Sequence, residues 1–283
     1  MKNQTRRKFF TTAWMGLAGM AAWPKVLAGK HLSASQVLPV GVEIGIASYG
    51  LRNLSLDEVV EIMKDLQLTK ISIKSMHLPY DLSPADIQMN MDKLLRAGLD
   101  PYAAGVIYMT TIEEVAEAFE YAKRAGFGMI VGVPDYRILD LAEQKVKAYD
   151  IKLAIHNHGP DGMPYPNAME VYERIKDRDK RIGICMDVAH IARSGLDPVE
   201  EIHLVKDRIY DVHLRDNTAN TKDGVACRPG QGNLDLPLII KALRDVEYQG
   251  VYTIEYGIEE ESPLTGTALT VGYIQGILAA LYS

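Results

Sequence analysis

Short apolar runs rich in β-branched residues alternate along this chain with segments whose apolar residues recur at helical spacing. The runs predict eight strands, at residues 43–49, 70–76, 101–107, 128–133, 151–158, 181–187, 208–214 and 250–256. The intervals predict helices, near residues 56–66, 84–97, 111–125, 137–149, 167–176, 198–206, 235–246 and 265–281. Strands separated by helices of about 10–15 residues are typical of parallel βαβ units. Eight such units predict a single α/β domain, a (β/α)₈ TIM barrel, over residues 41–283.

The residues at the predicted helix ends agree with this pattern. Ser83-Pro84 has the form of a helix start, and Gly98 and Gly126 stand where helices should end. The main alternative is an open, doubly wound sheet, which normally carries a glycine-rich phosphate loop after an early strand. Residues 47–50, at the end of the first strand, read Ala-Ser-Tyr-Gly. The absence of that loop favours the barrel.

The N-terminal segment has the layout of a bacterial twin-arginine export signal. Arg6-Arg7 precedes an apolar stretch at 9–22, which is too short to span a bilayer comfortably, and small residues near Ala28 suit cleavage. We therefore expect a signal peptide at 1–28, a short leader at 29–40 and a periplasmic location. The alternative is a basic amphipathic leader or a chance arginine pair. No other segment is expected to span a membrane, so the mature chain should not be inserted.

The charge balance narrows the choice of partners. The chain of 283 residues carries a net charge of −6, and its first 28 residues contain five basic residues and no acidic one, so the mature part is more acidic still. Nucleic-acid binding is not expected, because it needs clustered lysine and arginine. The two cysteines, Cys185 and Cys227, could pair, but a domain of this size needs no disulfide. The sequence leaves homo-oligomerisation open.

Polar and ionisable side chains gather where predicted strands end. They are Lys74 and His77 at the second strand, His156 and His158 at the fifth, Asp187 and His190 at the sixth, His213 and Arg215 at the seventh, and Glu255 at the eighth. The C-terminal ends of barrel strands form the active-site face of a TIM barrel. We therefore expect these side chains to converge there.

Two imidazoles and two carboxylates from different strands make a candidate set of metal ligands. Side chains on a strand point alternately to its two faces. Where the apolar side chains of a strand face the surrounding helices, its polar side chains therefore face the barrel axis. Ionisable groups converging inside a barrel are costly unless they are paired or bind a metal. We therefore expect one divalent ion, bound by His156, Asp187, His213 and Glu255. Mixed nitrogen and oxygen ligands of this kind suit Mn²⁺, Zn²⁺, Co²⁺ or Fe²⁺. The alternative is a hydrogen-bonded network without metal.

These residues carry a resemblance to a known family. The matching segments are His156-Asn157-His158, Met186-Asp187-Val188-Ala189-His190, Val212-His213-Leu214-Arg215-Asp216, Gly230-Gln231-Gly232 and Ile254-Glu255. With them the chain resembles the xylose-isomerase-like sugar isomerase/epimerase superfamily, which also includes metal-dependent apurinic endonucleases, in a subgroup with His-Asn-His. The resemblance implies that Asp187, His213 and Glu255 bind metal and that Glu255 exchanges a proton with substrate. It also implies that His190 and Arg215 contact the substrate.

One departure from the family bears on the mechanism. Sugar epimerases of this superfamily usually have a glutamate where this chain has His156, which puts a two-glutamate proton exchange in doubt. Alternation places Lys74 on the inward face of strand two, together with Ser72 and Met76. Lys74 is therefore a candidate base, because desolvation and a nearby metal lower the pKa of a lysine. The alternative is a lysine that reaches solvent. His158 is a further candidate base, and His77 a weaker candidate for substrate binding.

The reaction expected from this resemblance is proton removal next to a carbonyl, with a divalent ion stabilising the enediolate. The first interpretation is a sugar isomerase or epimerase, and the second is a lyase or hydratase that eliminates a β-leaving group from a 3-keto-sugar or 3-keto-glycoside. The substrate is therefore a small sugar or keto-sugar. A non-enzymatic sugar-binding module would bind ligand without metal-dependent turnover. An apurinic endonuclease would need more metal ligands than the sequence provides.

Overall fold

The computed structural model describes residues 38, 41–258 and 262–283. Eight strands close into a barrel in the order β1-β10-β7-β6-β5-β4-β3-β2. They are β1 (Ile44–Ala47), β2 (Lys70–Ile73), β3 (Asp100–Met109), β4 (Met129–Pro134), β5 (Lys152–His156), β6 (Ile182–Asp187), β7 (Ile209–Leu214) and β10 (Tyr252–Ile254). All neighbouring strands pair in parallel. The predicted TIM barrel is confirmed, whereas the predicted signal peptide and almost all of the leader lie outside the described residues.

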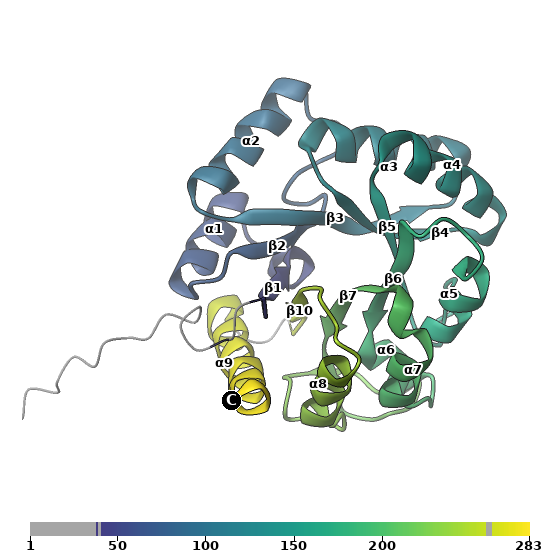
Figure 1. Cartoon of the computed structure of the whole chain (residues 1–283). Helices are drawn as coiled ribbons and strands as arrows, with labels where there is room; N and C mark the ends of the chain where they lie inside the picture. Colours follow the sequence, from purple (N-terminus) through teal and green to yellow (C-terminus); the bar gives the residue numbers. More distant parts are fainter. Residues whose placement is uncertain (1–37, 39–40, 259–261) are drawn as a thin grey trace, which may run out of the picture. The chain divides into compact units, whose positions relative to one another are not determined.

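Helices ring the strands, with α9 completing the ring beside α8 (Figure 1). They are α1 (Leu56–Asp65), α2 (Pro84–Arg96), α3 (Ile112–Ala125), α4 (Leu139–Tyr149), α5 (Ala168–Ile175), α6 (Val188–Arg193), α7 (Pro198–Val205), α8 (Leu236–Asp245) and α9 (Pro263–Tyr282). Their starts follow the local sequence. Ser55 and Thr111 each form a capping box, and Ser83 caps α2 ahead of Pro84. Gly126 ends α3 at φ 79°, as its position predicts.

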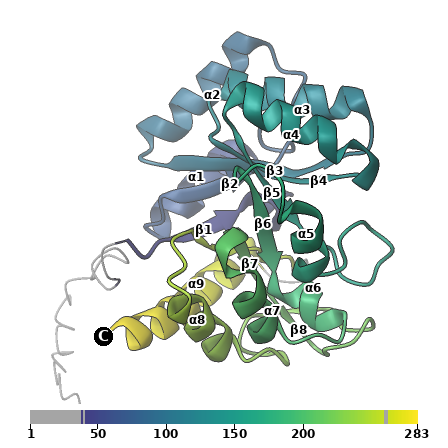
Figure 2. The same ribbon diagram turned by 45° about the vertical axis from the view of Figure 1, so that its right-hand side comes forward.

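Two features lie outside the predicted elements. The first is α6, which begins directly after its N-cap Asp187 and has six residues, too few to show a helical period. The second is a hairpin of two-residue strands, β8 (Asp216–Asn217) and β9 (Ala226–Cys227), in the loop after β7. Figure 2 shows α6 and β8 close together on the lower right of the barrel. Both features lie beyond the C-terminal ends of strands, where loops carry function.

The barrel interior contains a polar layer beneath the strand ends. Asp211 of β7 is fully buried, and its carboxylate accepts hydrogen bonds from the Tyr102 hydroxyl at 3.1 Å and from Thr253 Oγ1 at 2.9 Å. Burial raises the pKa of Asp211 to about 6. The main apolar core lies between the strands and the helices, with residues such as Met63, Ile71 and Phe119 fully buried. The polar layer thus supports the side chains that stand above it at the mouth.

The expectation that no segment beyond the N-terminal one spans a membrane bears on α9 in particular. Among the described helices, α9 is long and apolar enough to cross a membrane by length and composition, because its 20 residues include no charged side chain. It nevertheless packs on the barrel, burying residues such as Val271, Ile274 and Leu278. Arg244 Nη1 donates to the Leu281 carbonyl at 2.7 Å and so ties the C-terminal turn of α9 to α8. In this structure α9 is therefore the last outer helix of the barrel.

Candidate metal centre

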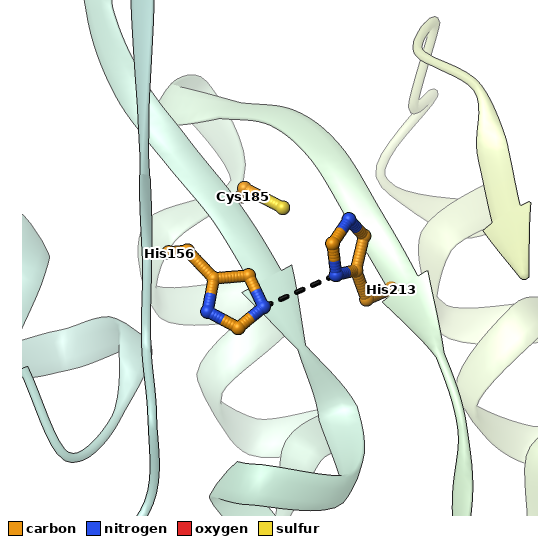
Figure 3. Close-up of side chains that lie close together, drawn as sticks. All are labelled: His156, Cys185 and His213. Carbon is orange, nitrogen blue, oxygen red and sulfur yellow. Dashed lines mark hydrogen bonds between the residues drawn. The ribbon is translucent and has the colours of Figure 1, made fainter. Parts of the chain in front are cut away.

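The four predicted metal ligands meet at the C-terminal ends of neighbouring strands. His156 ends β5, Asp187 ends β6, His213 lies on β7 and Glu255 directly follows β10. All four are buried, and one donor atom from each lies within 4.8 Å of the others. His156 Nε2 lies 3.1 Å from His213 Nδ1 (Figure 3). His213 Nδ1 in turn lies 2.8 Å from Glu255 Oε2, and His156 Nε2 lies 3.7 Å from Asp187 Oδ2.

Burial and the neighbouring charges set the protonation of this cluster. Burial lowers the pKa of His156 well below its ordinary value, and the nearby His213 adds to this. Burial alone would also lower the pKa of His213, but the Glu255 carboxylate outweighs it and raises that pKa. Burial would raise the pKa of Glu255, yet His213 and Arg215 hold it far below its usual range. The cluster therefore offers a neutral imidazole and an anionic carboxylate near neutral pH.

The local sequence fixes the position of Asp187. The amide of Asn157 donates to the Asp187 carbonyl at 3.1 Å, and the Asp187 backbone N–H donates to Asn157 Oδ1 at 2.9 Å. Asp187 Oδ1 accepts the backbone N–H of His190 at 2.9 Å and so caps α6. This leaves Asp187 Oδ2 directed toward the histidines. The central residue of His-Asn-His therefore couples the ends of β5 and β6.

The donor set fits a divalent cation. Two imidazole nitrogens and two carboxylate oxygens face one another in a buried space, and two ring nitrogens 3.1 Å apart can share one proton at most. Such a set is of the kind that binds Mn²⁺, Co²⁺, Zn²⁺ or Fe²⁺. His213 Nε2 points away from the cluster toward Asp211 Oδ2, 3.9 Å distant, as the second nitrogen of a metal-binding histidine commonly points toward a carboxylate.

Three further predicted residues surround the cluster. Arg215 Nη1 lies 3.4 Å from Asp187 Oδ2 and 3.9 Å from Glu255 Oε2. The His190 ring stacks on His158, with centroids 5.7 Å apart. His158 lies two residues beyond the end of β5, and its Nδ1 is 3.3 Å from His156 Nδ1. Burial, with a contribution from His190, lowers the pKa of His158 to about 4, so this imidazole is neutral at pH 7.

Lys74 lies at the mouth between two aromatic rings. It follows the last residue of β2, and its Nζ lies 4.7 Å from the centre of the Tyr49 ring and 5.6 Å from that of Tyr108. Burial lowers the pKa of Lys74, and the Glu255 charge opposes this only in part. The Tyr108 hydroxyl is also 2.8 Å from His158 Nε2. Tyr108 therefore links the lysine on one side of the mouth to the histidines on the other.

The structure differs from the sequence expectations in the segment after β2. β2 ends at Ile73, so alternation no longer applies at Met76, which is 41% exposed and does not face inward. His77 is buried, with Nδ1 3.0 Å from Ser48 Oγ and Nε2 3.1 Å from the Leu51 carbonyl. Both ring nitrogens are occupied by protein partners, which is the arrangement of a structural histidine. We therefore leave His77 out of the proposed substrate site.

Sequence reasoning missed the roles of several residues at the site. Tyr49 and Tyr108 lie near the ends of the first and third strands. The only signal in the sequence that could have identified them is an aromatic, partly polar residue at a strand end. Asp216 follows Arg215, and its carboxylate accepts the backbone N–H groups of Gly230 at 2.9 Å and Gly232 at 3.0 Å. The Gly-Gln-Gly segment is therefore held by a carboxylate that lies 14 to 16 residues earlier in the chain.

A model of the xylose isomerase-like TIM barrel family matches residues 41–271. MJ1311 of Methanocaldococcus jannaschii, an uncharacterized protein, is 27% identical over 204 residues, which cover 63% of this chain and 62% of that protein. The inosose dehydratase of Lacticaseibacillus casei is 23% identical over 132 residues, which cover 41% of this chain and 44% of the dehydratase. These matches span less than two thirds of either relative.

Solved structures share the fold at lower identity. The IolI protein, solved with a bound zinc atom, aligns with a TM-score of 0.74 at 17% identity, covering 86% of this chain and 100% of that chain. An L-ribulose 3-epimerase aligns with a TM-score of 0.70 at 15% identity, covering 85% and 96%. At these identities the likeness concerns the fold alone.

Proposed function

The chain belongs to the xylose isomerase-like TIM-barrel family, and on that premise we propose that it is a divalent-metal-dependent sugar enzyme that removes a proton next to a carbonyl group. The observation that carries this proposal is the convergence of four buried donor atoms at the barrel mouth. Groups able to exchange a proton flank them on two sides. Relatives and structural neighbours that include a dehydratase and an epimerase support the reaction class.

The proposed roles follow from position and charge. The cation is held by His156, Asp187, His213 and Glu255. When bound, it would act as a Lewis acid on the substrate oxygens. Arg215 neutralises the two carboxylates, and His190 faces the substrate beside His158. Lys74, whose pKa burial lowers, is the candidate base together with Glu255. His158, neutral at pH 7, is the candidate proton-exchanging group on the side of β5.

The first candidate reaction is isomerisation or epimerisation of a free sugar. Lys74 and Glu255 lie on the side of β2 and β10, whereas His158 lies beyond β5, three strands from either of them around the barrel. Proton-exchanging groups on two sides of a substrate can remove a proton at one position and return it at another. This arrangement supports a sugar isomerase or epimerase without a glutamate at the end of β5.

A specific observation favours the second candidate, a lyase or hydratase acting on 3-keto-sugars or 3-keto-glycosides. The pair Tyr108–His158, with 2.8 Å between hydroxyl and Nε2, offers a group able to protonate a leaving oxygen, and the usual glutamate is replaced by His156. In such an elimination the C–H bond next to the carbonyl breaks, a C=C bond forms and the C–O bond to the leaving group breaks. The leaving oxygen takes up a proton, so no redox partner is needed.

The deciding experiment is incubation with panels of free ketoses and of 3-keto-glycosides in D₂O, with and without Mn²⁺, followed by NMR. Isomerisation or epimerisation gives a new sugar, with or without deuterium at the exchanged carbon. Elimination gives an unsaturated product and a released group. Failure of every sugar to exchange or react in the metal-loaded protein would overturn the proposed function and favour the sugar-binding module.

The Lys74→Met variant tests the base within the same assay. Turnover should fall by about 100-fold or more, the usual scale for loss of a general base. Lys70→Met is the matched control, because Lys70 lies at the other end of β2 and pairs with Asp100 at 2.7 Å, away from the mouth. If Lys74→Met still exchanges substrate protons with D₂O at the rate of the parent protein, the base is Glu255 or His158 instead.

We also propose that the protein is exported by the twin-arginine route and works in the periplasm on an unphosphorylated sugar. Arg6-Arg7 supports this. Changing both arginines to lysine should retain the precursor in the cytoplasm while the purified protein keeps its metal affinity. Normal export of the double-lysine form would point to another route.

A further inference from the structure

Cys185 lies directly beneath the proposed metal centre. It precedes Asp187 by two residues on β6, so both side chains face the same way and Cys185 stands one step deeper in the barrel. Its side chain is fully buried and forms no disulfide, and its thiol donates a hydrogen bond to Asp211 Oδ2 at 3.9 Å. The Cys185 sulfur and one ring nitrogen each of His156 and His213 all lie within 4.8 Å of one another. Figure 3 shows the three side chains turned toward a common space.

The His213 ring provides an independent reason to look at this deeper position. Its Nδ1 faces His156, whereas its Nε2 is buried without a hydrogen-bond partner among the described residues. In Figure 3 this second nitrogen is the ring nitrogen of His213 that carries no dashed line. The nearest carboxylate oxygen, Asp211 Oδ2, is 3.9 Å from both His213 Nε2 and Cys185 Sγ. A buried imidazole nitrogen without a partner is costly, and coordination would remove that cost.

We propose that Cys185, His156 and His213 form a second, deeper ligand set that selects thiophilic divalent ions such as Zn²⁺ and Cd²⁺. Soft thiolate ligands favour these ions, whereas the carboxylates of Asp187 and Glu255 favour harder ions such as Mn²⁺. On binding, the S–H bond of Cys185 breaks, a sulfur–metal bond forms and the proton passes to solvent. A neutral imidazole has one nitrogen with a free lone pair, so His213 can bind one ion at a time, through Nδ1 in the carboxylate set or through Nε2 in the deeper set, and one ion excludes the other.

This competition would make the proposed enzyme selective for its metal. An ion drawn toward Cys185 moves away from Asp187 and Glu255, the ligands nearest the mouth, and thus away from the substrate. Zn²⁺ and Cd²⁺ should therefore bind while supporting little of the proposed reaction. That consequence rests on the proposed function, but the ligand set itself can be tested without any turnover.

The test uses the full folded protein, stripped by chelator and titrated with Cd²⁺ and with Co²⁺. A sulfur-to-metal charge-transfer absorption should appear with one equivalent of either ion. In Cys185→Ser this band should vanish, and Cd²⁺ affinity should fall by at least about 10-fold, the smallest effect usual even for groups outside the coordination sphere. Mn²⁺ affinity should be unchanged. Cys227→Ser is the matched control, because Cys227 lies on β9 outside the cluster and its loss should leave the band intact.

Cadmium NMR tests the proposal on the parent protein, without any variant. The chemical shift of bound cadmium differs between a site that contains sulfur and a site with only nitrogen and oxygen ligands. Absence of a sulfur signature in the parent protein would overturn the proposal, as would a band that survives in Cys185→Ser. Loss of the band in Cys227→Ser alone would assign it to the other cysteine. None of these results would bear on the carboxylate site, which is read separately by Mn²⁺ binding.

Discussion

At the scale of single residues, Asp187 uses its two carboxylate oxygens differently. Oδ1 accepts the His190 backbone N–H and starts α6, whereas Oδ2 faces His156 and Arg215. Lys74 also depends on several neighbours, because two tyrosine rings enclose its ammonium group and burial lowers its pKa. These separate contributions can be isolated by substitutions that change one of them at a time.

Asp187→Asn and Asp187→Ala should separate metal binding from helix capping. Asparagine caps a helix as well as aspartate does but lacks the charge, so both variants should lose metal affinity by more than about 100-fold. Only the alanine variant should also lose the cap, which costs about 1 kcal/mol in the free energy of unfolding of the metal-free protein. Calorimetric metal titration and urea unfolding measure the two effects. Full metal occupancy in Asp187→Asn would contradict the proposed ligand set.

The pH dependence of kcat/KM should reflect Lys74. A lysine base must be neutral, and burial lowers its pKa from the ordinary 10.5, so the rate should rise with pH and level off below pH 10.5. This rise should be lost in Lys74→Met and kept in Lys70→Met. A pH–rate profile measured at saturating metal tests it. An unchanged rise in Lys74→Met would show that another group titrates.

At the scale of elements, the loop after β7 is organised by one carboxylate. Asp216 accepts the N–H groups of Asn217, Gly230, Gly232 and Leu234, at 2.8 to 3.1 Å. Residues far apart in the loop are thereby drawn to one point beside Arg215. The close approach requires glycine, because a Cβ on Gly232 would lie 2.1 Å from Asp216 Oδ1.

Gly232→Ala should therefore destabilise this loop. The added methyl group must push aside both the Asp216 carboxylate and the Asn217 carbonyl, at a cost of about 1–3 kcal/mol in the free energy of unfolding. Gly128→Ala is the matched control, because a Cβ there meets no atom within 4 Å, and its effect should stay within about 0.5 kcal/mol. Urea denaturation compares the two. Equal stability of both variants would mean that the loop adapts without cost.

At the scale of the whole molecule, the barrel does not depend on metal for its core. Strand pairing closes the barrel, and the apolar core lies between the strands and the helices rather than at the mouth. The proposed ion would link β5, β6, β7 and the end of β10 at one face of an already closed sheet. It should therefore stabilise the fold by mass action rather than create it.

Chelation should lower Tm while the protein stays folded. Binding at about 100 times Kd contributes about 2.7 kcal/mol, which for a chain of this size corresponds to a Tm shift of about 5–10 °C. Re-addition of Mn²⁺ should restore the original Tm. Circular dichroism during heating, with and without chelator, measures the shift. Loss of helical signal at room temperature on chelation would instead identify the ion as structural.

The sequence by itself determined the barrel and the four residues that converge at its mouth. Both follow from local patterns, because period-two alternation fixes which side chains face inward and parallel strands bring their C-terminal ends to one face. The choice of His156, Asp187, His213 and Glu255 used these patterns together with the residue types, two imidazoles and two carboxylates. The metal role proposed for them remains a prediction.

Tertiary structure alone decided which other groups reach that mouth. Tyr108 meets His158 across 50 residues of sequence, and Cys185 meets the two histidines through the stagger of β5, β6 and β7. The surroundings of His77 were likewise decided by tertiary structure, since β2 ends at Ile73 and the imidazole beyond it lies within hydrogen-bond distance of Ser48 and Leu51. Alternation predicts a side chain's direction only while the strand continues. Beyond its end, register and packing against distant segments decide where that side chain lies.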